Sequence, residues 1–139
     1  MRARLIFALL ILTSCGELKT PTEPTGGGDP IDPTATFTRV QAEVFTPTCA
    51  TAGCHSTVGT QSNLVLTPAR SYAAIVGVAS VEMPQVLRVA PGDPAGSYLY
   101  RKLTGTNITG DRMPQGLPPL PADKLKLVRD WIRRGAPND

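Results

Sequence analysis

The sequence predicts a small, mainly α-helical domain of three to four short helices joined by long loops rich in proline and glycine. Apolar residues recur at helical spacing in four short segments of the chain. The 139 residues include 14 prolines and 13 glycines, and these interrupt regular structure between the four segments. No stretch alternates apolar and polar residues for long enough to predict a strand.

The first helix is expected to begin at Phe37. One helical face would be formed by Phe37, Val40, Val44 and Phe45. The Thr36 side chain can cap the first turn. Pro47 is expected to end the helix, because proline lacks an N–H and clashes with the preceding turn.

Two further short helices are expected in the middle of the chain. One would span residues 71–76 with Ser71 as its cap, although the end of this segment is equally compatible with extended structure. The other would start at Asp93–Pro94, with aspartate as the N-cap and proline at the first helical position, and would end before Gly105. Its apolar stripe would consist of Tyr98, Leu99 and Leu103.

The most strongly patterned helix is expected from about Ala122 to Arg134. Its apolar face would consist of Leu125, Val128, Trp131 and Ile132. The basic Arg133 and Arg134 suit the negative C-terminal end of a helix, and Gly135 can end it in the left-handed conformation.

The N-terminus has the pattern of an export signal. Arg2 and Arg4 precede an apolar run over residues 5–12, which is much shorter than the roughly 20 residues of a membrane-spanning helix. The run ends in Leu-Thr-Ser-Cys15, which resembles a bacterial lipobox. We therefore expect residues 1–14 to be a signal peptide and Cys15 to be lipidated, with an ordinary secretory signal as the alternative. Either interpretation places the mature protein outside the cytoplasm.

A linker is expected to follow. Residues 15–35 are rich in Pro, Thr and Gly and contain only two large aliphatic residues, so they offer little surface to bury. We therefore assign residues 15–35 to a lipidated N-terminus with a flexible tether and residues 36–139 to the folded domain.

Composition excludes several functional classes. The chain has 14 Lys and Arg against 11 Asp and Glu, and loss of the signal peptide would lower its net charge from +3 to about +1. Such a balance argues against a nucleic-acid-binding protein. A single His excludes any site that needs two imidazoles from one copy of the chain.

The chemically distinctive segment is Cys49-Ala-Thr-Ala-Gly-Cys54-His55. It brings two thiols and the only imidazole of the chain within seven residues. A Cys-x-x-Cys-His run is the attachment signal for c-type haem, in which the thiols bond to the porphyrin and His ligates iron. Here four residues separate the cysteines, and Gly53 gives the wider loop conformational freedom.

Three other interpretations of this segment remain open. A Cys49–Cys54 disulfide is plausible chemistry in an exported protein but leaves His55 unexplained. A structural zinc site would need a fourth ligand, which the sequence does not offer once Cys15 is lipidated. A thiol–disulfide oxidoreductase would need a closer cysteine pair on a different framework.

The distal position of such a haem could be filled by one of two methionines. Met113 and Met83 each precede a proline, and Met113 lies in a Pro/Gly-rich loop shortly before the last helix. A single methionine ordinarily fills space in the hydrophobic core and has no ligand role. The order of helix, Cys/Cys/His segment, Met-Pro loop and terminal helix resembles that of class I cytochromes c, and this resemblance favours Met113. Arg70, Arg101 and Arg112 could pair with haem propionates, although exposure to solvent is the ordinary state of each.

Because of this motif and this order of elements, residues 36–139 resemble small bacterial exported class I cytochrome c domains of the Cys-x4-Cys-His kind. The resemblance extends to Ala90-Pro91-Gly92-Asp93-Pro94, Arg112-Met113-Pro114 and Trp131-Ile132. It implies a single haem c held covalently by Cys49 and Cys54, with His55 as the proximal and Met113 as the distal iron ligand, and crossing first and last helices. The chain departs from the pattern at Pro121, where a Ser or Thr cap is common, and in its additional Met83.

The resemblance implies a one-electron carrier rather than an enzyme, because both axial positions of the iron would be filled. Its expected partners are redox proteins, and its lipid would anchor it to a bacterial membrane facing the periplasm or the cell exterior. Two alternatives stay open. One is a five-coordinate haem sensor or peroxidase-like protein, and the other is a haem-free, disulfide-bearing lipoprotein that acts as a binding module.

Overall fold

The computed structural model describes residues 29–139, and within them the chain is mainly helical. The helices are α1 (Phe37–Val40), η1 (Gln41–Cys49), α2 (Ser71–Ile75), α3 (Tyr98–Thr104) and α4 (Ala122–Arg133). Extended pairing in this part of the chain is limited to isolated bridges, such as that between Val76 and Val89. The expected signal peptide, the lipidation site Cys15 and residues 16–28 of the expected linker lie outside the described residues.

The first helix begins as predicted but ends later. The Thr36 hydroxyl accepts a hydrogen bond from the Arg39 amide at 3.2 Å, so it caps α1. The helix then continues without a break into η1, a π-helix that contains Pro47 and extends to Cys49. The prediction that Pro47 ends the helix is therefore wrong. In the wider π turn each hydrogen bond reaches back five residues. This spacing accommodates the Pro47 ring, which would clash with the preceding turn of an α-helix.

The second helix has the expected place but a different start. Arg70 is its N-cap, whereas Ser71, expected as the cap, is the first helical residue and is fully buried. The Ser71 hydroxyl donates a hydrogen bond to the Gln41 side-chain oxygen, and the Gln41 amide donates to the Leu66 carbonyl oxygen at 3.0 Å. Ser71 thus joins α2 to η1 instead of capping its own helix.

The third helix begins at Tyr98, four residues later than predicted. Asp93 caps a turn and not a helix, because its carboxylate accepts the Gly96 amide at 2.8 Å. The Ser97 hydroxyl then donates to the Asp93 carbonyl oxygen at 2.7 Å, which occupies the backbone group that a continuing helix would use. The helix ends as predicted at Gly105, whose positive φ of 76° suits glycine.

The last helix agrees with its prediction. It spans Ala122–Arg133 after an N-cap at Pro121 that makes no side-chain hydrogen bond. The buried face includes Val128, Trp131 and Ile132, while the predicted Leu125 is only partly buried. Gly135, with φ 93°, turns the chain back so that its amide donates to the Ile132 carbonyl oxygen at 2.9 Å.

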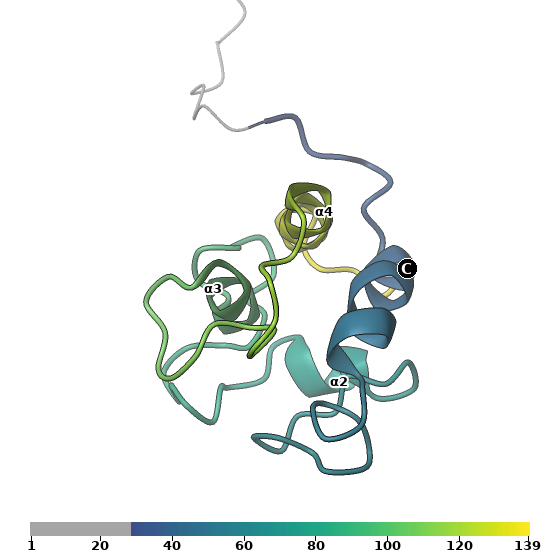
Figure 1. Ribbon diagram of the computed structural model, residues 1–139. Coiled ribbons are helices and arrows are strands. Elements are labelled where there is room, and N and C mark those ends of the chain that lie inside the picture. Colours follow the sequence, from purple (N-terminus) through teal and green to yellow (C-terminus); the bar gives the residue numbers. More distant parts are fainter. Residues whose placement is uncertain (1–28) are drawn as a thin grey trace, which may run out of the picture.

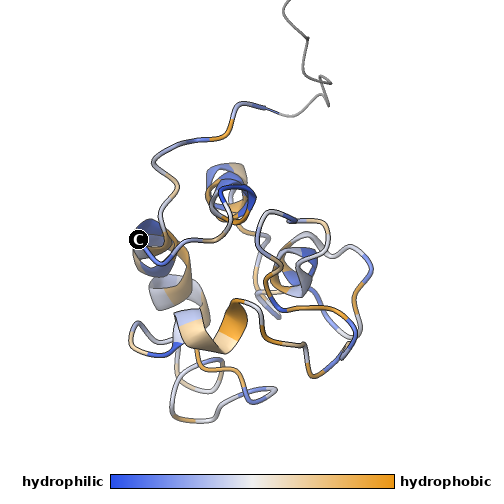
Figure 2. Cartoon of the chain, turned by 180° about the vertical axis from the view of Figure 1, so that it is seen from behind, coloured by the Kyte–Doolittle hydropathy of each residue, from blue (hydrophilic) through white to orange (hydrophobic). Residues whose placement is uncertain are grey.

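The core lies where α4 contacts α1 on one side and α3 on the other (Figure 1). Phe37 is in edge-to-face contact with both Phe45 and Tyr72, and its ring also packs on Trp131. Hydrophobic residues are distributed over one face of several short helices and the loops between them (Figure 2). No helix within residues 29–139 is long and apolar enough to cross a membrane.

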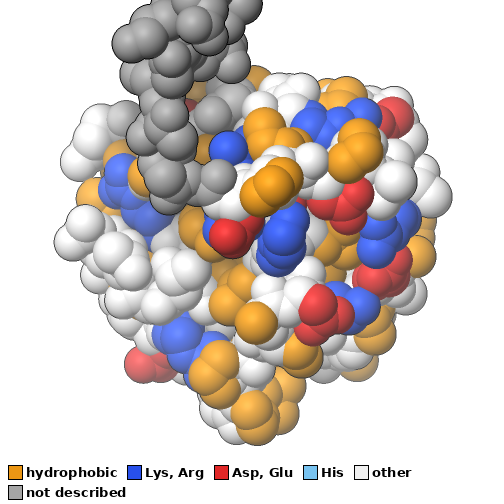
Figure 3. All heavy atoms as spheres, turned by 90° about the horizontal axis from the view of Figure 1, so that it is seen from above, with side chains coloured by type: hydrophobic (Ala, Val, Ile, Leu, Met, Phe, Trp, Pro, Cys, Tyr) orange, Lys and Arg blue, Asp and Glu red, His pale blue; other side chains and the backbone are white. Residues whose placement is uncertain are grey.

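Residues 29–35, expected to belong to the flexible linker, lie against α4. The Asp32 amide donates to the Asp130 carboxylate at 3.1 Å, and Arg134 donates to the Ala35 carbonyl oxygen at 2.6 Å. Ala35 itself is fully buried in the core. The folded part therefore begins earlier than residue 36. Polar contacts hold this segment to α4, among them the ion pair between Asp29 and Arg129 at 3.2 Å, and hydropathy does not detect such contacts. Figure 3 shows Lys, Arg, Asp and Glu side chains interspersed on one face of the molecule.

Candidate functional site

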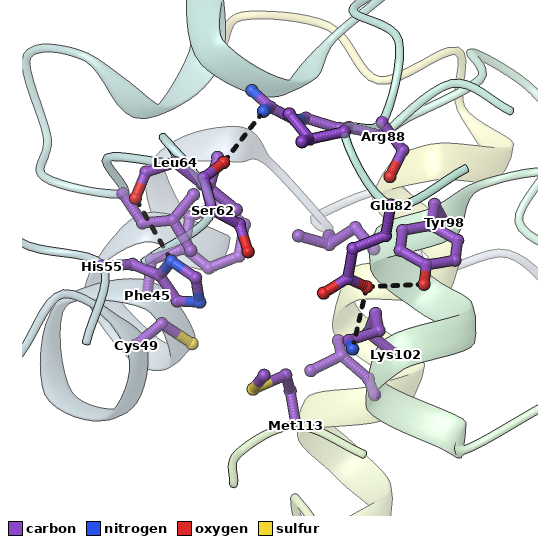
Figure 4. Close-up of a pocket in the computed structure, with 15 residues that line it drawn as sticks. Phe45, Cys49, His55, Ser62, Leu64, Glu82, Arg88, Tyr98, Lys102 and Met113 are labelled. Carbon is purple, nitrogen blue, oxygen red and sulfur yellow. Dashed lines mark hydrogen bonds and ion pairs between the residues drawn. The ribbon is translucent and has the colours of Figure 1, made fainter. Parts of the chain in front are cut away.

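Two adjoining cavities form the candidate site. They lie between the loop that follows η1 on one side and α3 with the loop before α4 on the other (Figure 4). The outer cavity has a volume of about 460 Å³, which is within the range of about 300–1,000 Å³ typical of ligand sites. The inner cavity, of about 80 Å³, is mostly apolar. The residues that line both cavities are Cys49, His55, Ser62, Glu82, Lys102 and Met113.

The two cysteines stand at either end of a compact loop. Cys49 is the last residue of η1, and its carbonyl oxygen accepts the His55 amide at 3.0 Å, which closes the loop on itself. Gly53 has a φ of 80°, so the left-handed turn before Cys54 is one that glycine adopts readily. Both thiols are free in the structure, Cys49 partly buried and Cys54 exposed. Both line the outer cavity.

Burial determines the state of the Cys49 thiol. Burial, with a smaller contribution from the charge of Cys54, raises the pKa of Cys49 to about 12. The Cys49 Sγ lies 3.8 Å from the Val44 carbonyl oxygen, which can accept a weak hydrogen bond from a protonated thiol. At neutral pH Cys49 is therefore a thiol that faces the cavity, and not a thiolate.

The His55 side chain is oriented by one backbone contact. Its Nδ1 lies 3.2 Å from the Leu64 carbonyl oxygen, and since a carbonyl can only accept, Nδ1 carries the proton. The second ring nitrogen then has a free lone pair and points into the cavity (Figure 4). Burial is the main cause that lowers the pKa of His55, and the positive charges of Arg88 and Lys102 lower it further. A neutral imidazole with its ring oriented in this way can bind a metal ion through its free nitrogen.

Of the two candidate methionines, only Met113 lines the cavities. Its backbone amide donates to the Lys102 carbonyl oxygen at 2.8 Å, which attaches the loop before α4 to α3. Its sulfur points toward the space that His55 and Cys49 also face (Figure 4). Met83 is partly buried and its amide donates to Ser80, but its side chain lines neither cavity.

A polar cluster that the sequence analysis missed forms the wall opposite His55. Glu82 accepts hydrogen bonds on Oε2 from the Tyr98 hydroxyl at 2.6 Å and from the Lys102 ammonium at 3.0 Å. Lys102 also donates to the Thr109 carbonyl oxygen at 2.9 Å and is only 9% exposed. The available signal was the spacing of Tyr98 and Lys102, since residues four apart share a helix face.

The three arginines considered as propionate partners lie outside the cavities, in keeping with the exposure expected for each. Arg70, Arg101 and Arg112 line neither cavity. Arg112 instead donates to the Met113 and Leu117 carbonyl oxygens, so it supports the loop that presents Met113. Arg88, not singled out from the sequence, lines the inner cavity and donates to the Ala74 carbonyl oxygen at 2.8 Å, while burial lowers its pKa.

The donors that meet in the cavities are an imidazole nitrogen, a thioether and two thiols. Among residues 29–139, no group of three His, Cys, Asp or Glu side chains gathers as a metal-binding cluster, so a zinc site gains no support from the described part. The set fits a haem of the c type, which needs one His, two thiols and an apolar chamber with one further axial donor. No family model, curated protein or solved structure matches the chain.

Proposed function

We propose that the chain is a one-electron carrier of the class I cytochrome c kind, with a single haem c in the adjoining cavities. The observation that carries the proposal is that Met113 lines the same two cavities as Cys49 and His55, which belong to a motif far from it in the sequence. A haem bound there would supply an iron that takes up and releases one electron. No curated relative contributes to the proposal, which rests on the sequence motif and on this geometry.

Different residues of the chain would attach the haem, bind its iron and exclude water from it. Cys49 and Cys54 would hold the haem by adding their thiols across its two vinyl groups, an addition in which each sulfhydryl hydrogen goes to vinyl carbon and no oxidant is needed. The free lone pair of His55 and the Met113 thioether would hold the iron. The apolar inner wall, which includes Phe45, keeps water away from the group.

If His55 and Met113 both hold the iron, no position would be open to a substrate, which favours electron transfer over catalysis. A soft thioether ligand stabilises the ferrous state, which favours a fairly high reduction potential. The partners would be redox proteins on the same membrane. A lipid on Cys15 and the residues that follow it would hold the domain near those partners and raise their effective concentration.

The test is the visible spectrum of the protein exported from a host that possesses the cytochrome c maturation machinery. We expect a coloured protein with a sharp α-band after dithionite reduction and a weak far-red band, typical of thioether ligation, in the ferric state. Boiling in detergent should leave the haem attached to wild type, whereas Cys49→Ser with Cys54→Ser should release it.

Paired methionine variants identify the distal ligand. Met113→Ala should abolish the far-red band, and the matched control Met83→Ala should retain it, because Met83 lines neither cavity. Loss of the band only in Met83→Ala would reassign the ligand. A wild-type protein without the band would favour a five-coordinate haem sensor or peroxidase. A colourless product from a competent host would refute the proposal and favour the haem-free lipoprotein.

A further inference from the structure

An ion pair lies in the cavity wall that faces His55 (Figure 4). Lys102 Nζ and Glu82 Oε2 are 3.0 Å apart, and their side chains are 11% and 30% exposed, respectively. Both residues line the inner and the outer cavity, so the pair stands where the two meet. Lys102 has little contact with water, so its charge is screened less than a surface charge, whereas Glu82 is more exposed and its charge is screened more.

The pair is held in place by neighbours that do not belong to the donor set. The Tyr98 hydroxyl donates to the same Glu82 oxygen that Lys102 binds, at 2.6 Å. The Thr109 amide donates to the Tyr98 oxygen at 3.1 Å, and the Thr109 carbonyl accepts from Lys102 at 2.9 Å. The two charges therefore have fixed positions relative to the cavity.

The pair and His55 face the same space. Glu82, Lys102 and His55 all line both cavities, and the pair lies on the wall opposite His55 (Figure 4). A charge that forms beside His55 would therefore act on both members of the pair across the cavity.

We propose that Glu82 and Lys102 act in opposite directions on the reduction potential of the haem iron that His55 would hold, so that the paired charges offset each other; this inference rests on the proposed function. The ferric centre carries one more positive charge than the ferrous centre. The Glu82 carboxylate stabilises the ferric state, and the Lys102 ammonium stabilises the ferrous state. In the intact pair these two effects oppose each other, and neutralising one member leaves the other uncompensated.

The test is redox potentiometry at pH 7 on the haem-loaded protein. Glu82→Gln should raise the midpoint potential and Lys102→Gln should lower it. Each should change the equilibrium constant of reduction by about three- to tenfold, where tenfold corresponds to about 59 mV for one electron. The double variant should return to within about twofold of wild type, because it removes both charges.

Two controls separate charge from structure. Lys102→Arg keeps the charge and should keep the potential, which a purely structural role for lysine would not predict. Glu43→Gln neutralises a carboxylate that binds Lys124 at 2.8 Å outside both cavities, and it should leave the potential unchanged. Far-ultraviolet circular dichroism of each variant checks that the helices are retained.

The outcomes distinguish this inference from the proposed function. A coloured protein in which both single variants shift the potential in the same direction, or by less than twofold, would overturn the role of the pair and leave the electron carrier standing. The same holds if Lys102→Arg shifts the potential as much as Lys102→Gln. A colourless wild-type protein overturns both.

Discussion

The ring of Phe37 in α1 and the indole of Trp131 in α4 lie with their centroids 5.4 Å apart and their planes tilted by 41°. This contact joins the beginning of the folded chain to its end. The indole Nε1 also donates to the Pro137 carbonyl oxygen at 2.9 Å, which holds the C-terminal residues against the core. Asp139 in turn accepts the Phe37 amide at 2.8 Å.

Trp131→Ala should destabilise the domain by about 3–5 kcal/mol, because it removes a fully buried aromatic ring and leaves a cavity between α1 and α4. Trp131→Phe should lose less, about 1–2 kcal/mol, since it retains a ring but not the hydrogen bond to Pro137. Urea unfolding of samples with equal cofactor content would measure the free energy of unfolding of both variants.

The matched control for this prediction is Leu117→Ala. Leu117 is a large hydrophobic residue with 54% exposure, so its truncation should change the free energy of unfolding by less than about 0.5 kcal/mol. A Trp131→Ala variant as stable as Leu117→Ala would show that the contact between the first and last helices is not what stabilises the fold.

The sequence predicted the helices whose apolar residues follow a helical period. The start of α1 at Thr36 and the buried face of α4 around Trp131 both agree with that pattern. The errors lie where a side chain has two competing partners. Asp93 can cap a helix or a turn, and here it binds the Gly96 amide, so α3 begins at Tyr98. Local sequence does not decide between such options, because tertiary contacts do.

The candidate site was predictable only where its residues are adjacent in sequence. Cys49, Cys54 and His55 form one motif, and their arrangement around a loop follows from it. Glu82 and Lys102, in contrast, are twenty residues apart and meet only through the fold. The spacing of Tyr98 and Lys102 places both on one helix face, but a Lys beside an apolar stripe is ordinarily solvated, so this spacing alone did not indicate that Lys102 would be buried in a cavity wall.

Asp130 should make stability depend on pH. Its carboxylate is fully buried and accepts hydrogen bonds from the Asp32 amide, Lys126 and Arg129. Burial raises the pKa of Asp130, but these hydrogen bonds outweigh it and the net shift is downward. A folded-state pKa below the unfolded one contributes stability above the unfolded value, and that contribution is lost as the pH falls through the folded value.

Asp130→Asn should therefore lower the free energy of unfolding by about 1–3 kcal/mol at pH 7, with a difference from wild type that shrinks below about pH 4. Urea unfolding at a series of pH values would measure it. Asp123→Asn, at a carboxylate with 69% exposure, is the control and should have little effect at any pH. A difference that stays constant down to pH 2 would contradict the role of the Asp130 charge.

The two cysteines should differ in reactivity before any cofactor is attached. A pKa of about 12 leaves on the order of one Cys49 in ten thousand as thiolate at pH 8, and only the thiolate reacts quickly. Cys54 is exposed, whereas Cys49 is partly buried. In reduced, cofactor-free protein, iodoacetamide should alkylate Cys54 at least about tenfold faster than Cys49.

Single variants assign this difference to each thiol. Cys54→Ser leaves only the slow Cys49 reaction among residues 29–139, and its rate should rise about tenfold per pH unit up to pH 10, since the pKa lies above that range. Cys49→Ser should leave the fast reaction. Peptide mass spectrometry after timed quenching gives both rates. Equal rates for the two thiols would mean that burial does not control Cys49.

Membrane attachment should depend on Cys15. The lipobox-like Leu-Thr-Ser-Cys15 predicts a lipid on this thiol, and Cys15→Ala would remove the group to which that lipid is attached. Each buried CH₂ group of such a lipid contributes about 0.8 kcal/mol to membrane binding. The mature wild-type protein should therefore enter the detergent phase on phase separation, and Cys15→Ala should remain in the aqueous phase. Cys54→Ser, which removes a different thiol, should behave like wild type. If Cys15→Ala still enters the detergent phase, the attachment has another origin, and the tethered carrier gives way to a protein held by its own surface or by a partner.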